Sequence, residues 1–195
     1  GEPDEPSVEK VQKKIGVLFQ NGALIGSLSV ADNVALPLRM HTSLTRDIIE
    51  EIVAIKLGLV GLSHARNLFV RELSGGMRKR AALARALALD PPLLFCDEPS
   101  AGLDPVSSAG LDNLLLSLRD RLGITIVVVT HELHSIERIT DKLIFLHNGS
   151  ILFEGTLEQA RAVTIDAVAD FFQRREPSAP ETAARRRLFT VENTL

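Results

Sequence analysis

The chain has 195 residues, a formal net charge of −3 and 45% hydrophobic residues, which is enough apolar material for the core of one ordinary domain. Its weak negative charge and its 4% aromatic content disfavour a nucleic-acid partner, because they supply neither a basic field nor stacking rings. Cys96 is the single cysteine, which excludes an internal disulfide and a cysteine-rich metal site.

Targeting segments and the two ends of the chain are the next features of the sequence. No apolar run approaches the roughly 18 residues of a membrane span, and no signal-peptide pattern is present, so we expect a cytoplasmic protein. The chain starts with Gly1 and an acidic, proline-bearing stretch, from which we expect a fragment that lacks its amino-terminal portion. After Arg174 the composition predicts a mobile tail.

Three apolar runs have the length of strands: Ile15–Phe19, Leu93–Cys96 and Ile124–Thr130. Continuous apolar runs of this length are typical of strands buried on both faces, as in a parallel sheet. Helical patterns separate them, from Gly75 to about Leu89 and from Pro105 to Gly123. The alternation predicts an α/β fold, a mostly parallel sheet with helices on both faces.

Between the first and second strands, Ser29 to about Leu73 has a helical pattern and predicts a small helical subdomain. Ser29 is a candidate N-cap, and a stripe of apolar residues predicts the core-facing side of a helix near residues 45–58: Ile48, Ile52, Ile55 and Leu59. Farther along, Asn148-Gly149 predicts the type I′ turn of a β-hairpin, and the segment Thr156–Phe172 is expected to be helical.

Polar residues follow each predicted strand: Gln20 follows the first, Asp97 and Glu98 the second, and His131 the third. Open α/β sheets bind their ligands at the carboxyl ends of the strands. Asp97 is suited to hold Mg²⁺ through its water shell, and Glu98 to orient or deprotonate an attacking water. For these two acids alone, a solvated pair at a strand end is an equal alternative.

A second candidate site lies at a helix N-terminus. Ser74, Gly75 and Gly76 place backbone N–H groups and a hydroxyl there, and such a terminus attracts anionic phosphate through its dipole and its unpaired donors. Arg78, Lys79 and Arg80, which come next, are expected to form a solvated face of the same helix.

The 32-residue run Leu73–Asp104 resembles the signature motif, Walker B motif and D-loop of ATP-binding cassette (ABC) ATPases, and the resemblance extends from about Ile15 to Gly155. It implies a P-loop NTPase fold that uses ATP and Mg²⁺. In it, Glu98 would be the general base, Asp97 the metal residue, and Gln20 the Q-loop residue that reaches Mg²⁺ and the attacking water. The roles of the remaining residues are also implied by the resemblance: His131 would touch the γ-phosphate, Ser74, Gly75 and Gly76 would contact ATP held by a second subunit, and Asp104 would organise the subunit interface.

The same resemblance implies a division of the chain into parts. Residues 1–22 would end the amino-terminal part of a RecA-like core with the Q-loop, and residues 23–74 would form the helical subdomain. Residues 75–160 would form the rest of the core, and residues 161–195 a C-terminal helix and mobile tail.

One part of the family pattern has no counterpart in the chain. Phosphoryl chemistry in this fold uses G-x-x-x-x-G-K-[ST], the loop whose lysine cradles the phosphates. None of the six lysines follows a glycine and precedes Ser or Thr. We therefore expect these 195 residues to bind ATP weakly if at all and not to hydrolyse it alone.

The segment Leu18–Arg39 resembles the ATPases of MCE-associated, Mla-type lipid transporters. That resemblance implies an identical second subunit, a membrane permease docked on the helical subdomain, an MCE-domain protein as a further partner, and a position on the cytoplasmic side of the inner membrane. Another importer-type ATPase and a non-catalytic binding or regulatory module are the alternatives. DNA-repair and chromosome ATPases are excluded, because only 53 residues separate Gln20 from Ser74, too few for their long coiled coil.

Overall fold

The computed structural model describes residues 10–173. The chain divides into two compact units, with the boundary between Ile139 and Thr140. None of the helices in the described range is both long and apolar enough to cross a membrane.

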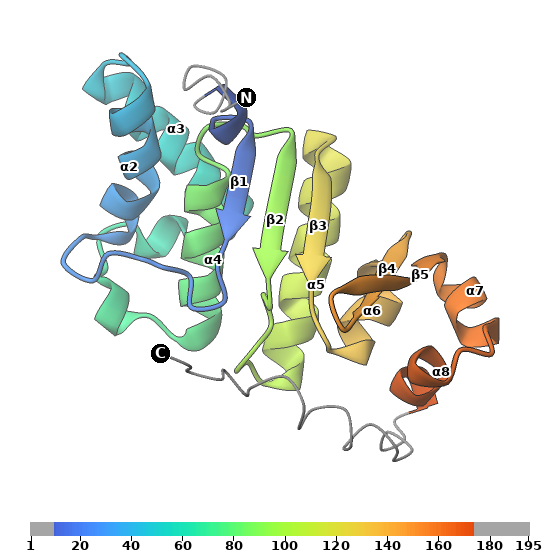
Figure 1. The fold of residues 1–195 in the computed structure, drawn as a ribbon. Helices are drawn as coiled ribbons and strands as arrows, with labels where there is room; N and C mark the ends of the chain where they lie inside the picture. The colour runs from blue at the N-terminus through green and yellow to red at the C-terminus, as the bar shows by residue number, and fades with distance from the viewer. Residues whose placement is uncertain (1–9, 174–195) are drawn as a thin grey trace, which may run out of the picture. The chain divides into compact units, whose positions relative to one another are not determined.

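The first unit is built on a parallel sheet of three strands, β1 (Ile15–Leu18), β2 (Leu93–Asp97) and β3 (Thr125–Val129), in that spatial order (Figure 1). Leu18 pairs with Cys96, and Cys96 with Val128. The predicted parallel sheet is therefore confirmed. Because all three strands run the same way, the residues that follow them come together at one edge.

The helices of this unit belong to the predicted helical subdomain and to the crossovers between strands. The subdomain contains α2 (Val30–His41), α3 (Arg46–Leu59) and two 3₁₀ turns, η1 (Ser63–Ala65) and η2 (Val70–Glu72). The crossover helices are α4 (Gly75–Ala86) and α5 (Pro105–Leu122), and α6 (Leu133–Ile139) follows β3. Pro105 occupies the first turn of α5, and Gly123, at φ 62°, ends it in the left-handed conformation that glycine favours.

Helix α4 lies unusually close to β1 because glycine and alanine line the contact. A Cβ built on Gly16 would lie 2.5 Å from the carbonyl oxygen of Ala86, so no side chain fits there. Gly22, at φ 73°, faces the Cβ of Ala82 in the same way. The small residues thus bring α4 against the strand and the loop that carry Gln20.

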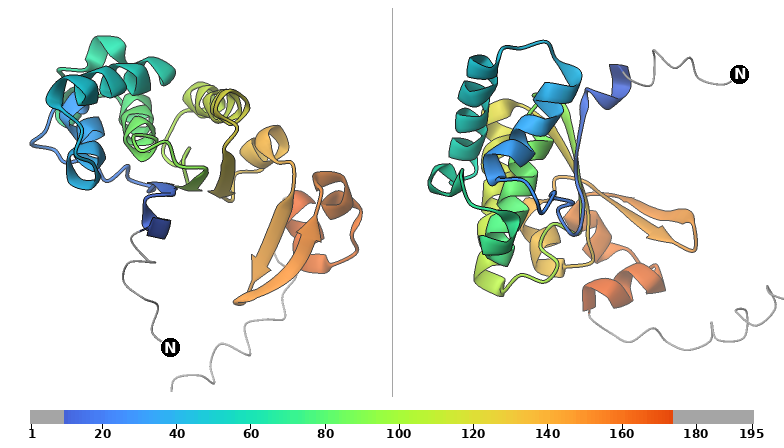
Figure 2. Two further views of the ribbon diagram at one scale, coloured as in Figure 1. Left: turned by 90° about the horizontal axis from the view of Figure 1, so that it is seen from above. Right: turned by 90° about the vertical axis from the view of Figure 1, so that its left-hand side faces the viewer.

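Within the first unit, over residues 10–139, α4 and α5 cover one face of the sheet and no helix covers the other (Figure 2). Alternate strand residues, among them Leu18, Leu94 and Cys96, are buried beneath these helices. Apolar residues of the other face are exposed: Val17, Phe95, Val127 and Val129. The sequence predicts strands buried on both sides, whereas within residues 10–139 helices cover one face of the sheet.

The core-facing side of α3 differs from the prediction. Ile48 and Ile55 of the expected stripe are exposed, whereas Ile49, Val53 and Leu57 are buried. Both sets have helical spacing, so periodicity alone does not choose between them. The packing of α3 against α2 and α4 selects the second set.

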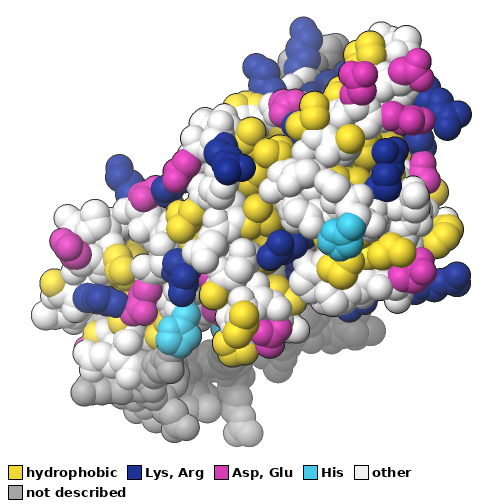
Figure 3. All heavy atoms as spheres, turned by 180° about the vertical axis from the view of Figure 1, so that it is seen from behind, with side chains coloured by type: hydrophobic (Ala, Val, Ile, Leu, Met, Phe, Trp, Pro, Cys, Tyr) yellow, Lys and Arg dark blue, Asp and Glu magenta, His cyan; other side chains and the backbone are white. Residues whose placement is uncertain are grey.

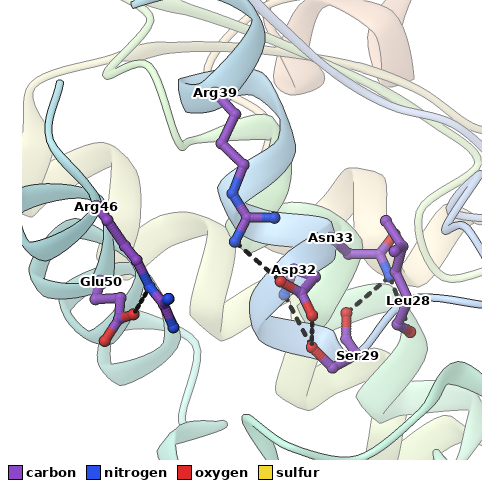
Figure 4. A network of polar contacts seen from close by, with 7 residues as sticks. All are labelled: Leu28, Ser29, Asp32, Asn33, Arg39, Arg46 and Glu50. Atoms are coloured by element: carbon purple, nitrogen blue, oxygen red, sulfur yellow. Dashed lines mark hydrogen bonds and ion pairs between the residues drawn. The ribbon is translucent and has the colours of Figure 1, made fainter. Parts of the chain in front are cut away.

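A polar network holds the loop that leads into α2 (Figure 4). Ser29 is the N-cap, as predicted, and its Oγ accepts from the backbone N–H of Asp32 at 3.0 Å. The buried Asn33 accepts from the N–H of Ile25 at 2.8 Å and donates to the carbonyls of Ile25, Leu28 and Ser29 at 3.1, 3.4 and 2.9 Å. One side chain thus fixes both ends of the loop.

The second unit begins with an antiparallel hairpin of β4 (Leu143–His147) and β5 (Ser150–Gly155). Asn148 and Gly149 both have positive φ, 49° and 76°, which confirms the predicted turn. The helical segment predicted after it forms two helices, α7 (Leu157–Ala162) and α8 (Asp166–Gln173). They are divided at Val163, Thr164 and Ile165, three β-branched residues that disfavour helix. The predicted mobile tail lies outside the described residues.

Acidic and basic side chains are interspersed on the face seen in Figure 3. The charges there do not gather into a single-signed patch. This agrees with the small net charge of the sequence.

Candidate functional site

Four predicted site residues, Gln20, Asp97, Glu98 and His131, lie at the carboxyl edge of the parallel sheet. Asp97 is the last residue of β2, and Gln20 and His131 each come two residues after their strands end. Gln20, Asp97 and His131 are exposed. The strand order brings all four to one side of the molecule, where a ligand can reach them from solvent.

Glu98 is held by contacts on its backbone and its side chain. Its N–H donates to the carbonyl of Val129 at 2.8 Å, which ties it to β3. Its carboxylate contacts Nδ1 of His131 at 2.6 Å through Oε1 and accepts from the hydroxyl of Thr130 at 3.3 Å through Oε2. Only 18% of the Glu98 side chain is exposed, against 77% for His131.

The contact between Glu98 and His131 determines which ring nitrogen of the imidazole carries the hydrogen. A carboxylate oxygen can only accept, so Nδ1 of His131 carries a hydrogen and Nε2 is the nitrogen that titrates. The hydrogen bond that His131 donates to Glu98, followed by the attraction of the Glu98 charge, raises the pKa of His131. The pair therefore combines a carboxylate base with an adjacent imidazole that gains positive charge readily.

The N-terminus of α4 has the features predicted for phosphate binding. Ser74 is its N-cap, and the Ser74 Oγ accepts from the N–H of Met77 at 3.2 Å. The first turn contains no acidic residue, so nothing there neutralises the positive end of the helix dipole. A Cβ on Gly75 would lie 3.4 Å from the side chain of Leu103, which places this terminus beside the segment that leads to Asp104.

Asp104 has a local structural role in this chain. It is the N-cap of α5, and its Oδ1 accepts from the N–H groups of Val106 and Ser107, both at 3.0 Å. Hydrogen bonds from Ser107, and then from Val106, lower the pKa of Asp104. The side chain thus fixes the start of α5.

The chemistry of the edge suits Mg²⁺ rather than a metal caged by protein. Within residues 10–173, no group of three or more His, Cys, Asp or Glu side chains is arranged to hold a metal ion. Asp97 and Gln20 can offer a carboxylate and an amide oxygen. Mg²⁺ is commonly held by one or two such ligands, with water and substrate phosphates completing its shell, so these residues fit it.

Lys79 was missed by sequence reasoning. The prediction that it lies on a solvated face is wrong, because it is 7% exposed. Its Nζ donates to the backbone carbonyls of Gln20 and of Glu98, the latter at 3.2 Å. Helical spacing places Lys79 on the same face of α4 as Ala82, Leu83 and Ala86, and this spacing was the sequence signal that could have indicated its burial. Burial lowers the pKa of Lys79, opposed by the nearby carboxylates of Glu132, Glu98 and Asp97.

Thr130 was also missed, because nothing in the apolar run that it ends marks it as functional. Its hydroxyl donates to Glu98 and accepts from the N–H of Glu132 at 3.1 Å. Thr130 therefore links the carboxylate to the turn that carries His131.

Comparisons with known proteins agree with this geometry. The profile of the ABC transporter family matches residues 2–101. The intermembrane phospholipid transport system ATP-binding protein MlaF of Haemophilus influenzae is 45% identical over 150 residues, which are 77% of this chain and 57% of that protein. The probable ribonucleotide transport ATP-binding protein mkl of Mycobacterium bovis is 44% identical over 149 residues, 76% of this chain and 42% of that protein.

Solved structures give the same result. Clostridium perfringens cbiO1, part of the ABC transporter complex cbiONQ, superposes with a TM-score of 0.75 at 29% identity over 82% of this chain and 63% of its own. The ATP-binding cassette MJ0796, in a dimeric post-hydrolysis state bound to ADP and Pi, superposes with a TM-score of 0.70 at 32% identity over 80% of this chain and 68% of its own. The chain spans about half the length of the curated relatives it matches. By its sequence, its fold and the residues at its sheet edge, the chain belongs to the ABC transporter family.

Proposed function

We propose that the chain forms part of the ATP-hydrolysing subunit of an ABC transporter, with its reaction at the sheet edge that carries Glu98. The observation that supports this most is the setting of the Glu98 carboxylate, which is largely buried yet hydrogen-bonded by Nδ1 of His131 and by the hydroxyl of Thr130. A carboxylate held in this way beside an open edge is suited to accept a proton from an attacking water.

The other edge residues have complementary roles in this proposal. Asp97 and Gln20 would hold Mg²⁺ and orient water, and His131, charged when its Nε2 is protonated, would stabilise the terminal phosphate. Mg²⁺ would supply charge neutralisation of the phosphate oxygens. Glu98 would accept the proton of the attacking water, and the hydrogen bond that Nδ1 of His131 donates to Glu98 holds the imidazole in its orientation.

The proposed reaction also needs a loop that cradles the phosphates. The 195 residues contain no G-x-x-x-x-G-K-[ST] loop, so we propose that hydrolysis requires a further polypeptide segment that supplies it. The exposed apolar face of the sheet, with Val17, Phe95 and Val127, is a surface that such a segment could cover.

A second subunit is the other proposed partner. Ser74, Gly75 and Gly76 would contact the nucleotide that it holds, and Asp104 would lie at the interface between the two. Their support is the positive end of α4, whose first turn contains no acidic residue and which lies beside the segment that leads to α5, and the dimeric state reported for MJ0796.

For the transported substrate we propose phospholipid, supported by the 45% identity to MlaF and by the resemblance of Leu18–Arg39. A membrane permease would dock on the helical subdomain and hold the subunit at the inner membrane, with an MCE-domain protein in the same assembly. Exposed apolar residues on that subdomain support such a contact: Met40, Leu44, Ile48 and Ile55. Ribonucleotide transport is the second candidate, because the mkl relatives carry that name.

The proposal is tested by measuring Mg²⁺-dependent ATP hydrolysis by two species. The 195-residue chain alone is expected to show none above background. The product of the complete reading frame, purified with its permease in phospholipid vesicles, is expected to hydrolyse ATP and to move labelled phospholipid. Turnover by the 195 residues alone refutes the need for a further segment, and ATP-dependent movement of ribonucleotides but not of lipid favours the second candidate.

The proposed division of the polypeptide follows the same roles. Residues 1–22 and 75–160 would carry the reaction, residues 23–74 would bind the permease, and residues 161–195 would form a C-terminal extension. Limited proteolysis of the assembled transporter would show protection of residues 23–74 if the permease contacts them, and loss of that protection when the permease is removed. Equal cleavage in both states would contradict the assignment.

A further inference from the structure

Lys79 connects three parts of the candidate site. It lies in the second turn of α4, the helix that begins at Ser74, and its buried Nζ donates to the carbonyls of Gln20 and Glu98. Those two residues follow neighbouring strands, β1 and β2. A single cation therefore joins the signature helix to the carboxyl ends of both strands.

The backbone of Glu98 needs such support. Its φ is 44°, in the left-handed region that residues with a side chain rarely adopt. Conformations of this kind persist where the surroundings hold them. Here the Glu98 carbonyl accepts from the N–H of Ala101 at 3.2 Å and from Nζ of Lys79 at 3.2 Å, while its N–H is held by Val129.

We propose that Lys79 is a positioning residue for Glu98. Its hydrogen bonds to the carbonyls of Gln20 and Glu98 hold the left-handed peptide in place, and that peptide directs the Glu98 carboxylate onto His131. Bonds from a charged donor are stronger than neutral ones, and the low exposure of Lys79 reduces competition from water. The consequence for ATP hydrolysis rests on the proposed function, whereas the positioning itself does not.

Arg85 holds the same loop as one of the two hydrogen bonds of Lys79, so the effects of those two bonds can be distinguished. It lies on the same helix and donates to the carbonyls of Ala23 and Gly22 at 2.7 and 2.9 Å. Helix α4 thus grips the loop after Gln20 through Arg85 as well as through Lys79. Lys79 adds the bond to the Glu98 carbonyl, and so its loss is expected to affect the Glu98–His131 pair specifically.

The test uses the imidazole of His131 as a reporter of where Glu98 lies. Its C2 proton is titrated by NMR in the 195-residue chain without nucleotide, and the resonance is assigned with His131→Gln. The carboxylates that act on His131 are those of Glu98 and Glu132. In Lys79→Met we expect the pKa of His131 to fall toward the ordinary histidine value of about 6.5, because Glu98 is no longer held against the ring.

The direction of the change separates positioning from simple electrostatics. Removing a nearby positive charge would by itself raise the pKa of His131, so a fall requires that the contact with Glu98 has loosened. Lys79→Arg, which keeps a charged donor, is expected to retain the raised pKa. Lys56→Met is the matched control: Lys56 is a buried lysine that pairs with Asp90 away from the edge, and its loss should lower the melting temperature without moving the His131 pKa.

Two results would overturn the proposal. One is a folded Lys79→Met protein in which the pKa of His131 is unchanged or raised, and the other is an equal fall in Lys56→Met, which would indicate general loosening. If Lys79→Met does not fold by circular dichroism, Lys79→Leu replaces it with the same outcomes, since it also removes the donor. Because no step uses nucleotide, failure of the proposed ATPase function leaves these readouts unaffected.

Discussion

Asn33 is the residue whose removal gives the sharpest test of how the loop after Gln20 is held. Its side chain is fully buried and makes four hydrogen bonds to the backbone of Ile25, Leu28 and Ser29. Asn33→Ala leaves these backbone groups without that partner. A net value of about 1 kcal/mol for each of the three bonds of 3.1 Å or shorter gives an expected loss of about 3 kcal/mol in the free energy of unfolding.

The assay is urea unfolding followed by far-ultraviolet circular dichroism, because the chain contains no Trp or Tyr for fluorescence. With a urea dependence of about 2–3 kcal/mol per molar, the midpoint for Asn33→Ala should fall by about 1 M. Asn113→Ala is the control: Asn113 is exposed, so we expect a change within about 0.5 kcal/mol. A loss for Asn33→Ala as small as that of the control would refute the reasoning.

Three further predictions concern other parts of the chain. Ser29→Ala removes the N-cap of α2 and should lower the free energy of unfolding by about 1 kcal/mol in urea. Because the hydrogen bond from Ser29, and after it Arg39, lowers the pKa of Asp32, this stabilisation should be present above the pKa that Asp32 has in the unfolded chain and be lost as the pH falls through its pKa in the folded chain. An unchanged dependence of stability on acid pH in the variant would contradict the assignment. Burial raises the pKa of Cys96 to about 12, so a thiol reagent at pH 8 should react with it in urea and not in buffer, whereas rapid labelling of the folded chain would show that this strand opens. Gly123→Ala places a side chain at φ 62° and should lower stability by about 1 kcal/mol; a neutral or stabilising result would mean that the end of α5 relaxes.

The location of the candidate site could be predicted because it depends on the order of strands and helices. Apolar runs gave β1, β2 and β3, and the parallel direction that their crossovers require brings Gln20, Glu98 and His131 to one edge. Motif residues at strand ends therefore converge whatever the details of packing.

The inner contacts of the site could not be predicted, because they depend on which side of each element is buried. Both faces of α3 have helical spacing, and only packing against its neighbours favours Ile49 over Ile48. Lys79 is a buried charged residue that donates to two backbone carbonyls, and no local sequence pattern specifies those partners. The exposure of one face of the sheet likewise depends on what packs against it, and the sequence of the strands does not specify that.

The central claim is that Glu98 acts as the base of ATP hydrolysis, and the rate of one variant tests it most directly. In the product of the complete reading frame, Glu98→Gln should lower the Mg²⁺-dependent turnover number by roughly 10²–10⁴-fold, the contribution typical of a positioned base. ATP binding should persist, because the amide keeps the size of the side chain. Glu132→Gln is the matched control, since this neighbouring carboxylate contacts Ser108 at 3.5 Å, and its turnover should change little. A Glu98→Gln enzyme that retains the wild-type turnover number would contradict the account.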